Sequence, residues 1–157
     1  MNKLLKKVVL LLVTGAGIGY IPRIPGTVGT FIAIPFSFAL NSIALSNFLV
    51  ATVLLIGSVA GAVWLCSQFA GMLNQKDPQS IVIDEMVGFL VANFLAPFSL
   101  TALLWSFALF RFFDISKIFP ANRLERLPGG AGIVLDDVMA GLYTFASLRL
   151  LLKLGWV

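Results

Sequence analysis

The sequence predicts an all-α protein, a polytopic bundle of membrane helices. Of its 157 residues, 59% are hydrophobic and only 11% are charged, whereas about a quarter of the residues in soluble domains are charged. No charged residue occurs between Arg23 and Lys76 or between Glu85 and Arg111. Uncharged stretches of this length are typical of segments buried in lipid. No change in composition suggests a boundary, so we expect a single membrane-embedded domain over residues 1–157.

The N-terminal segment, Met1–Tyr20, places three lysines before an apolar run. This arrangement is similar to a secretory signal peptide, which is cleaved after small residues. We expect the segment to be retained, because a polar motif that we assign to the functional site follows it immediately.

The two apolar segments that follow predict a transmembrane hairpin. Val28–Leu45 and Phe48–Cys66 contain about 18 and 19 residues, and each would measure about 27 Å as a helix, close to the thickness of the hydrocarbon core. Polar residues gather at the turn between them, and Pro35 is a candidate kink in the first arm. The more polar segment Ser67–Ser80 ends in turn residues and would return the chain to its starting side.

The next apolar segment, Met86–Phe110, allows two topologies because Pro97 and Ser99 interrupt its middle. A single span would place Glu85 and Arg111 on opposite faces of the membrane. Two half-helices joined by a turn would return both residues to one face. We favour the re-entrant pair of half-helices, because the acidic motifs make chemical sense only together and half-helices form binding sites in other membrane proteins.

The C-terminal part combines a charged segment with a last apolar stretch. Arg111–Arg126 is the most charged part of the chain, and a glycine-rich loop over residues 128–132 follows it. Val138–Val157 is apolar except for Arg149 and Lys153. This stretch either spans the membrane with both side chains reaching toward the head groups or lies against the other helices.

The basic residues indicate the orientation of the bundle. With the re-entrant topology, nine of them can lie on one side, which the positive-inside rule makes cytoplasmic. They form no patch with interleaved aromatic residues, so the net charge of +4 favours contact with anionic lipid over nucleic acid. The nine residues are Lys3, Lys6, Lys7, Arg23, Lys76, Arg111, Lys117, Arg123 and Arg126.

Five of the seven acidic residues fall in three short clusters: Asp84 with Glu85, Asp114 alone, and Asp136 with Asp137. Acids this close to apolar helices are costly to bury and are usually paired, bound to metal or functional. Helix capping explains one acid per helix. A second carboxylate beside the first adds repulsion unless a cation neutralises it. The two pairs are therefore candidate ligands of a cation.

Small residues accompany both acidic pairs. Gly88 and Ala140 each stand four residues beyond the first acid of a pair, which would let two helices approach closely with both acidic ends facing a common point. The chain contains no histidine, and Cys66 is its one cysteine. Oxygen ligands alone suit a hard ion, so we expect magnesium before manganese. The predicted metal ligands are Asp84, Glu85, Asp136 and Asp137.

Arg111, Asp114 and Lys117 are spaced by three, so neighbouring members lie near one another on a helix. A surface ion-pair ladder would show the same spacing. In the functional interpretation, Arg111 and Lys117 contact the non-bridging oxygens of a phosphate, and Asp114 contacts a metal ion or the attacking water. The triplet taken alone is weak evidence for either interpretation.

A motif rich in glycine and threonine opens the first long span. Arg23, Gly26, Thr27 and Thr30, with the backbone amides of a helix N-terminus, could hold an anion. The same residues could serve only as a helix cap and a stop signal. These two interpretations stand equal on the residues alone.

Four motifs occur in a fixed order: PGTVGT at 25–30, IVIDEMVG at 81–88, FRFFDISK at 110–117 and GGAGIVLDDVMAG at 129–141. Together they resemble the phosphatidylglycerophosphatase A family of bacterial membrane enzymes, over nearly the whole chain. The resemblance implies magnesium-dependent hydrolysis of phosphatidylglycerophosphate to phosphatidylglycerol and inorganic phosphate, in phospholipid synthesis. With the orientation expected from the basic residues, the site would face the cytoplasm from the inner membrane. One departure is that Pro120 remains of the two prolines that tend to follow the lysine in the family.

These residues predict a mechanism. The two acidic pairs hold one or two magnesium ions, and Asp114 orients or deprotonates the attacking water. Arg111, Lys117 and Arg23 neutralise charge on the phosphate oxygens in the transition state. Direct attack by water and an aspartyl-phosphate intermediate are both compatible with the sequence.

Two other classes of membrane protein predict different patterns. A small carrier of ions or solutes would spread its acids along the depth of several spans, whereas these acids cluster at the inferred ends of helices. An enzyme that transfers a phospho-alcohol would gather its aspartates at regular spacing within one motif, and this chain does not. The sequence gives neither the number of spans nor the oligomeric state.

Overall fold

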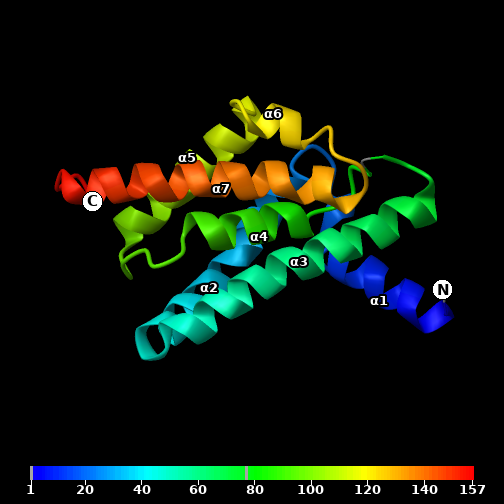
Figure 1. The fold of residues 1–157 in the computed structure, drawn as a ribbon, viewed down its shortest axis with the longest axis horizontal. Coiled ribbons are helices and arrows are strands. Elements are labelled where there is room, and N and C mark those ends of the chain that lie inside the picture. Colours follow the sequence, from blue (N-terminus) through cyan, green and yellow to red (C-terminus); the bar gives the residue numbers. More distant parts are fainter. Residues whose placement is uncertain (1, 77) are drawn as a thin grey trace.

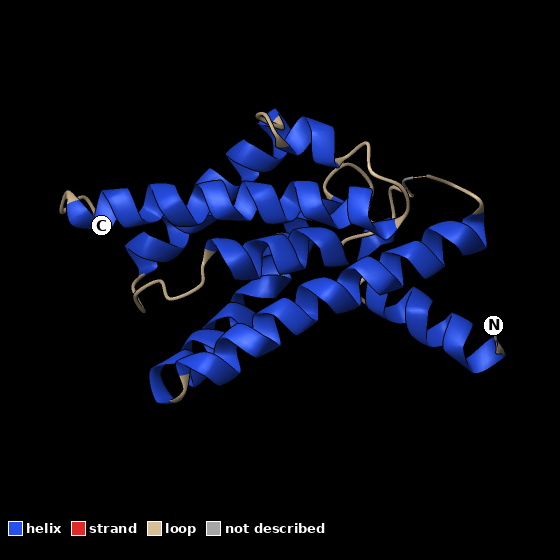
Figure 2. Cartoon of the chain, viewed as in Figure 1, coloured by secondary structure: helices blue, strands red, loops and turns tan. Residues whose placement is uncertain are grey.

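The computed structural model describes residues 2–76 and 78–157, so Met1 and Asp77, which fall in the predicted N-terminal segment and in the predicted turn, lie outside it. The described chain consists of helices joined by loops, without a strand (Figure 2). This confirms the predicted all-α class. The elements are α1 (Lys3–Val13), η1 (Ile18–Tyr20), α2 (Pro25–Ser46), α3 (Phe48–Leu73), α4 (Ile83–Ala92), α5 (Leu100–Ser116), α6 (Ala121–Leu124) and α7 (Gly130–Lys153).

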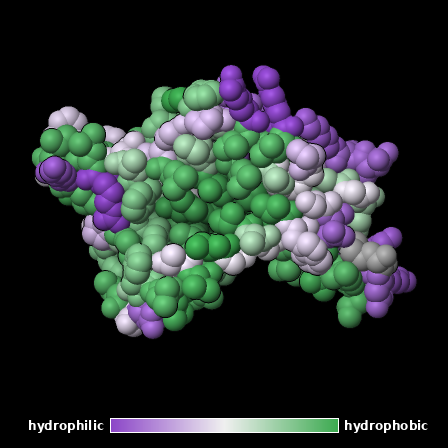
Figure 3. Space-filling model, viewed as in Figure 1, coloured by the Kyte–Doolittle hydropathy of each residue, from purple (hydrophilic) through white to green (hydrophobic). Residues whose placement is uncertain are grey.

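The long helices α2 and α3 form the predicted hairpin. The turn between them is a single residue, Asn47, whose side chain accepts a hydrogen bond from the amide of Val50 (3.1 Å) and so caps α3. α2 continues as one helix through Pro35. By length and composition, α2, α3 and α7 can each cross a membrane. Figure 3 shows the matching surface, a broad hydrophobic face whose hydrophilic residues gather mainly at the edge near α6 and the loop before α4.

The predicted break within the fourth apolar segment is present. α4 ends at Ala92, and α5 begins at Leu100 after a loop that contains Pro97. Glu85 at the start of α4 and Arg111 near the end of α5 lie on the same side, since both side chains lie next to Gly26. A Cβ atom added at Gly26 would collide with the Glu85 carboxylate and stand 3.3 Å from Nη1 of Arg111. Figure 1 shows α4 held between α2, α3 and α7. The predicted break and return are therefore present, with α4 a half-helix of 10 residues and α5 longer than predicted at 17 residues.

A buried polar network satisfies the backbone where α4 stops. Asn41 of α2 donates from Nδ2 to the carbonyl of Asn93 (2.9 Å) and accepts from the amide of Leu95 (2.8 Å). The Asn93 side chain in turn donates to the hydroxyl of Ser37 (2.9 Å). Ser37, Asn41 and Asn93 are all buried. Because lipid offers no hydrogen bonds to a broken helix, these side chains supply partners to the backbone of residues 93 and 95, where the chain leaves α4.

Arg149 completes the network from α7. Its Nη2 atom donates to the carbonyls of Phe94 (3.1 Å) and Leu95 (2.7 Å), and the guanidinium group lies over the ring of Phe145. The sequence predicts that Arg149 and Lys153 either reach toward the head groups or lie against the other helices. Arg149 lies against the other helices, whereas Lys153 is exposed in the last turn of α7.

Glycines bring α4 and α7 into direct backbone contact. A Cβ atom added at Gly88 would stand 2.8 Å from the carbonyl oxygen of Asp137, and one added at Gly141 would collide with the carbonyl oxygen of Gly88. Ala140 is fully buried beside them. The close approach predicted from the small residues is thus present, and it places the acidic ends of the two helices side by side.

We predict that Asn41→Leu destabilises the protein in detergent by about 2 to 4 kcal/mol, because it leaves buried backbone groups of the α4–α5 loop without partners. The measurement is the thermal unfolding midpoint. Ser42→Ala is the matched control, since Ser42 is exposed and bonds only to its own helix. Equal midpoints for the two variants would contradict the role assigned to the network.

A second prediction concerns the α4–α7 contact. Gly141→Ala should lower stability by about 1 to 3 kcal/mol and reduce activity, because the added methyl group forces the two backbones apart. Gly57→Ala in α3 is the control, as nothing lies within 4 Å of its added Cβ atom. The control should be neutral or slightly stabilising, since alanine favours helix over glycine. A similar loss in both variants would argue against tight packing at Gly141.

Candidate active site

A polar cavity of about 830 Å³ opens at one end of the bundle, where α4 and α7 begin and α5 ends. Its wall also includes the loop before α2 and the loop between α3 and α4. Among the described residues, six acids and three bases line it. The acids are Asp84, Glu85, Asp114, Glu125, Asp136 and Asp137, and the bases are Arg23, Lys76 and Lys117. An anionic phosphate would meet repulsion here unless bound cations offset the acids.

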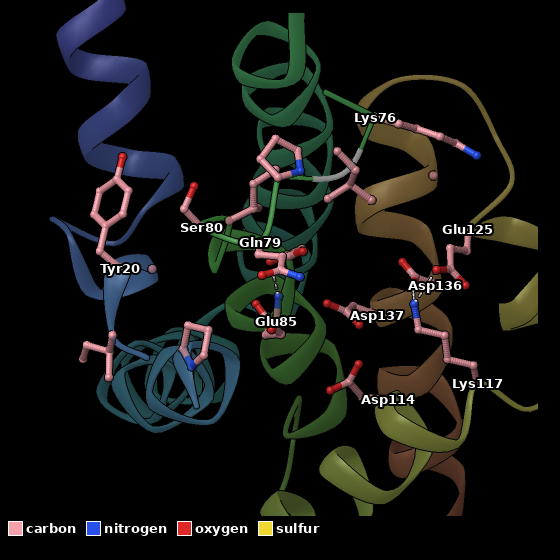
Figure 4. Close-up of a pocket in the computed structure, with 18 of the residues that line it drawn as sticks. Tyr20, Lys76, Gln79, Ser80, Glu85, Asp114, Lys117, Glu125, Asp136 and Asp137 are labelled. Carbon is pink, nitrogen blue, oxygen red and sulfur yellow. Dashed lines mark hydrogen bonds and ion pairs between the residues drawn. The ribbon is translucent and has the colours of Figure 1, made fainter. Parts of the chain in front are cut away.

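Three carboxylates converge at the base of the cavity. Asp84 and Glu85 lie in the first turn of α4, and Asp137 lies in the second turn of α7. One carboxylate oxygen from each can be chosen so that all three lie within 4.8 Å of one another. Gly26 makes room for this arrangement, because any side chain there would displace the Glu85 carboxylate. Figure 4 shows Glu85, Asp137 and Asp114 directed toward one another between the helices.

The carboxylate cluster is electrostatically unfavourable by itself. Two unit charges about 5 Å apart repel by roughly 3 kcal/mol at an effective dielectric constant of 20. Burial raises the pKa of Asp84 well above its usual value, and the charge of Glu85 raises it further. Burial also raises the pKa of Glu85. Its Oε2 atom is buried and accepts no hydrogen bond. A hard divalent cation fits this donor set, because it would bind the free oxygens and cancel the repulsion.

Asp136, the fourth predicted metal ligand, is engaged differently. Its Oδ2 atom accepts a hydrogen bond from Nζ of Lys117 (2.8 Å), while its Oδ1 atom is buried without a partner. Lys117 is also 3.1 Å from Glu125. Burial lowers the pKa of Lys117, but the two carboxylates outweigh this effect and the pKa lies above its usual value. The ammonium group therefore stays charged, and metal binding by Asp136 stays a prediction.

Arg111 and Asp114 form the other ion pair of the predicted triplet. Nη1 of Arg111 is 2.6 Å from Oδ2 of Asp114, and both side chains are largely buried. Asp114 lines the cavity, and its charge acts on Glu85 and Asp137. The three-residue spacing thus produces a contact, but a buried one at the cavity instead of a surface ladder.

The motif at the start of α2 contributes some residues to the cavity wall and others to helix packing. Arg23 and Pro25 line the cavity. Gly26, Thr27 and Thr30 are not among the described residues of its wall. Thr30 is fully buried, and its hydroxyl donates to the carbonyl of Gly26 (2.9 Å). A phosphate-binding role for these three residues stays a prediction, whereas the packing role of Gly26 is evident.

Other residues of the cavity carried no clear signal in the sequence. Glu125 holds Lys117 from the segment after α6, although it stands alone in a run of basic residues. Lys76, Gln79 and Ser80 come from the loop before α4, and Tyr20 comes from η1. Their nearness to the acids depends on how the loops pack. For Lys76, Gln79 and Ser80, the polarity of residues 74–80 was the only signal in the sequence.

Comparison with known proteins identifies the family to which the chain belongs. The sequence profile of a family described as Phosphatidylglycerophosphatase A matches residues 11–152, which include both acidic pairs. The chain belongs to the phosphatidylglycerophosphatase A family. No solved structure matches the chain significantly.

Curated relatives of the phosphatidylglycerophosphatase A family extend over most of the chain. Phosphatidylglycerophosphatase A of Haemophilus influenzae is 39% identical over 152 residues, which cover 90% of this chain and 90% of the relative. Phosphatidylglycerophosphatase A of Escherichia coli K12 is 34% identical over 135 residues, 83% of this chain and 76% of the relative. A Bacteroides thetaiotaomicron protein named putative phosphatidylinositol-3-phosphatase is 36% identical over 143 residues, 87% and 88% of the two chains.

The raised pKa values of Asp84 and Glu85 predict how metal binding depends on pH. In metal-free protein these carboxyls keep their protons above the ordinary range near pH 4, and a cation must displace them. Magnesium should therefore raise the thermal unfolding midpoint more at about pH 8 than at about pH 5.5. Asp137→Asn should reduce the shift at both values. An equal shift at the two pH values would contradict binding at the cluster.

Proposed function

We propose that this protein hydrolyses phosphatidylglycerophosphate to phosphatidylglycerol and inorganic phosphate, with magnesium as its cofactor. Membership of the phosphatidylglycerophosphatase A family and two relatives that carry this name support the activity. The structural observation that carries the proposal is the cluster of Asp84, Glu85 and Asp137 at the base of a polar cavity. A lipid head group can reach such a site from the membrane surface.

The position of the acids favours an enzyme over a carrier. The acids of the cavity gather at one end of the bundle, where α4 and α7 begin. In the part of the chain that the structure describes, the two buried aspartates of the spans, Asp136 and Asp137, both line the cavity, and the buried polar groups further along the spans are amides and hydroxyls such as Asn41 and Thr144. A carrier would need polar groups for its substrate along the whole path.

Magnesium is supported by the chemistry of the donor set. Asp84, Glu85 and Asp137 would hold it, and Asp136 has a free buried oxygen nearby that could complete the site. When bound there, the ion would polarise the phosphate oxygens and lower the pKa of a coordinated water. The excess of acids over bases in the wall gives the same indication, because the substrate is an anion.

The remaining charged residues supply positioning and charge stabilisation. Arg111 holds Asp114 at the edge of the cavity, so that Asp114 can orient the attacking water or accept its proton. Lys117 stays charged between Asp136 and Glu125, at a place where it can contact phosphate oxygens as negative charge spreads over them.

The membrane setting follows from the spans and the basic residues. Three helices can cross a bilayer, and Arg23, Lys76 and Lys117 line the cavity at the same end of the bundle. By the positive-inside rule this end faces the cytoplasm. We infer that the enzyme resides in the inner membrane with its site on the cytoplasmic side.

The decisive test is phosphate release from phosphatidylglycerophosphate by protein purified in detergent. Magnesium should be required, and Asp137→Asn should lower kcat at least about 100-fold, because the variant removes a ligand charge at the cluster. Glu125→Gln is the matched control, because Glu125 is half exposed and lies outside the cluster. This variant should lower kcat by less than about tenfold. Folded wild-type protein that releases no phosphate with magnesium would refute the proposal.

Phosphatidylinositol 3-phosphate should be assayed in parallel with phosphatidylglycerophosphate. The name of the Bacteroides relative makes this lipid a second candidate substrate. Both lipids carry a phosphomonoester on a head group that is joined to diacylglycerol through a phosphodiester. A higher kcat/KM for the inositol lipid would assign the chain to that activity, and a lower one would support phosphatidylglycerophosphate.

A further inference from the structure

Arg23 stands apart from the other cations of the site. It lies on the loop between η1 and α2 and lines the cavity. Its φ angle of 76° is in the left-handed region, which a non-glycine residue adopts at a cost and which is common at functional sites. Arg111 and Lys117 are ion-paired, whereas Arg23 forms no ion pair with any residue that the structure describes. Its guanidinium group is therefore available to an external anion.

The neighbours of Arg23 mark the edge of the cavity that meets lipid. Ile24, the first of them, is 53% exposed and directly precedes the spanning helix α2. Phe31 is 66% exposed two turns further into the span. With Val28 and Pro35 they follow the helical spacing of 24, 28, 31 and 35, which places them on one face. This face of α2, the 24–35 stripe, begins beside Arg23 and Pro25 of the cavity wall and runs along a helix that can span the membrane.

The opposite edge of the cavity has a different character. Lys76 is also exposed and forms no ion pair with a described residue. It follows the exposed polar residues Asn74 and Gln75. Figure 4 shows its side chain extending over the beginning of α7, on the side of the cavity that also carries Glu125. Of the two cations, Arg23 is thus the one at the boundary between polar cavity and lipid.

The proposed substrate has two phosphates, and the second needs a place. If the phosphomonoester binds at the carboxylate cluster, the phosphodiester must lie where the head group leaves the cavity for the bilayer. The cavity, at about 830 Å³, has room for the glycerol between the two phosphates. Arginine is suited to the diester, because its planar guanidinium group can donate two parallel hydrogen bonds to phosphate oxygens.

We propose that Arg23 binds the phosphodiester of the lipid substrate and that the 24–35 stripe of α2 carries its acyl chains. Arg23 is then a specificity-determining residue that selects lipids with a second phosphate and does not act on the phosphate that is transferred. This inference rests on the proposed function and assigns Arg23 a different phosphate from the one that the sequence suggested.

The test separates the two phosphates with ligands that each contain one of them. Phosphatidylglycerol, the product, has the diester alone, and inorganic phosphate represents the monoester alone. For Arg23→Ala, KM for phosphatidylglycerophosphate should rise about tenfold or more, and kcat should stay within about threefold. The inhibition constant of phosphatidylglycerol should rise by the same factor, while that of inorganic phosphate should not change. Arg23→Lys should fall between wild type and Arg23→Ala.

Two lysine variants control for a general loss of charge. Lys153→Ala, far along the chain in the last turn of α7, should leave all four constants unchanged. A rise in KM for Lys76→Ala that equals or exceeds that of Arg23→Ala would place the diester at the opposite edge and overturn the proposal. A fall in kcat without a change in KM would show that Arg23 acts on the transferred phosphate, and would also overturn it.

A second matched pair of variants tests whether the 24–35 stripe binds the acyl chains. Phe31→Ala should raise KM for a long-chain substrate but not for a short-chain analogue. Phe36→Ala is the control, since Phe36 is similarly exposed on α2 but faces the groove toward α3 and α4. Equal effects of the two variants would contradict the path along the stripe. Wild-type protein without activity on the lipid would instead mean that the proposed function has failed.

Discussion

A helix that stops inside a membrane must find partners for the carbonyls of its last turn, and this requirement governs the bundle. α4 ends deep among the other helices, and side chains from both α2 and α7 reach its broken end. Asn41 and Arg149 are thus shared between the half-helix and the spans that enclose it. Because lipid cannot compensate for a lost bond, this network fixes how far α4 extends into the bundle.

The position of α4 decides the chemistry at its other end. Glycines at positions 88 and 141 let α4 and α7 approach at backbone distance, and Gly26 of α2 leaves room for the Glu85 side chain. The approach brings Asp84 and Glu85 against Asp137, although like charges at this separation repel. Hydrophobic and backbone contacts therefore hold the carboxylates together in spite of this repulsion. The packing prepares the cluster for the cation that we propose.

The two sides of the cavity differ in polarity. The 74–80 loop and the segment after α6 are polar, and they supply Lys76 and Glu125 to the wall. The side formed by the η1–α2 loop is different, because Arg23 adjoins an apolar face of a spanning helix. An amphipathic ligand fits this asymmetry. A soluble phosphate ester would use only the polar part.

The amino-acid pattern alone predicts the membrane class, the α2–α3 hairpin, the break near Pro97 and the identity of the acidic ends. These features depend on local patterns of charge, proline and small residues, which act over a few turns of helix. The tertiary structure decided which acids meet: Asp137 joins the cluster, while its neighbour Asp136 turns to Lys117. Successive residues of a helix point about 100° apart. Their partners therefore depend on neighbouring helices, which no local pattern contains.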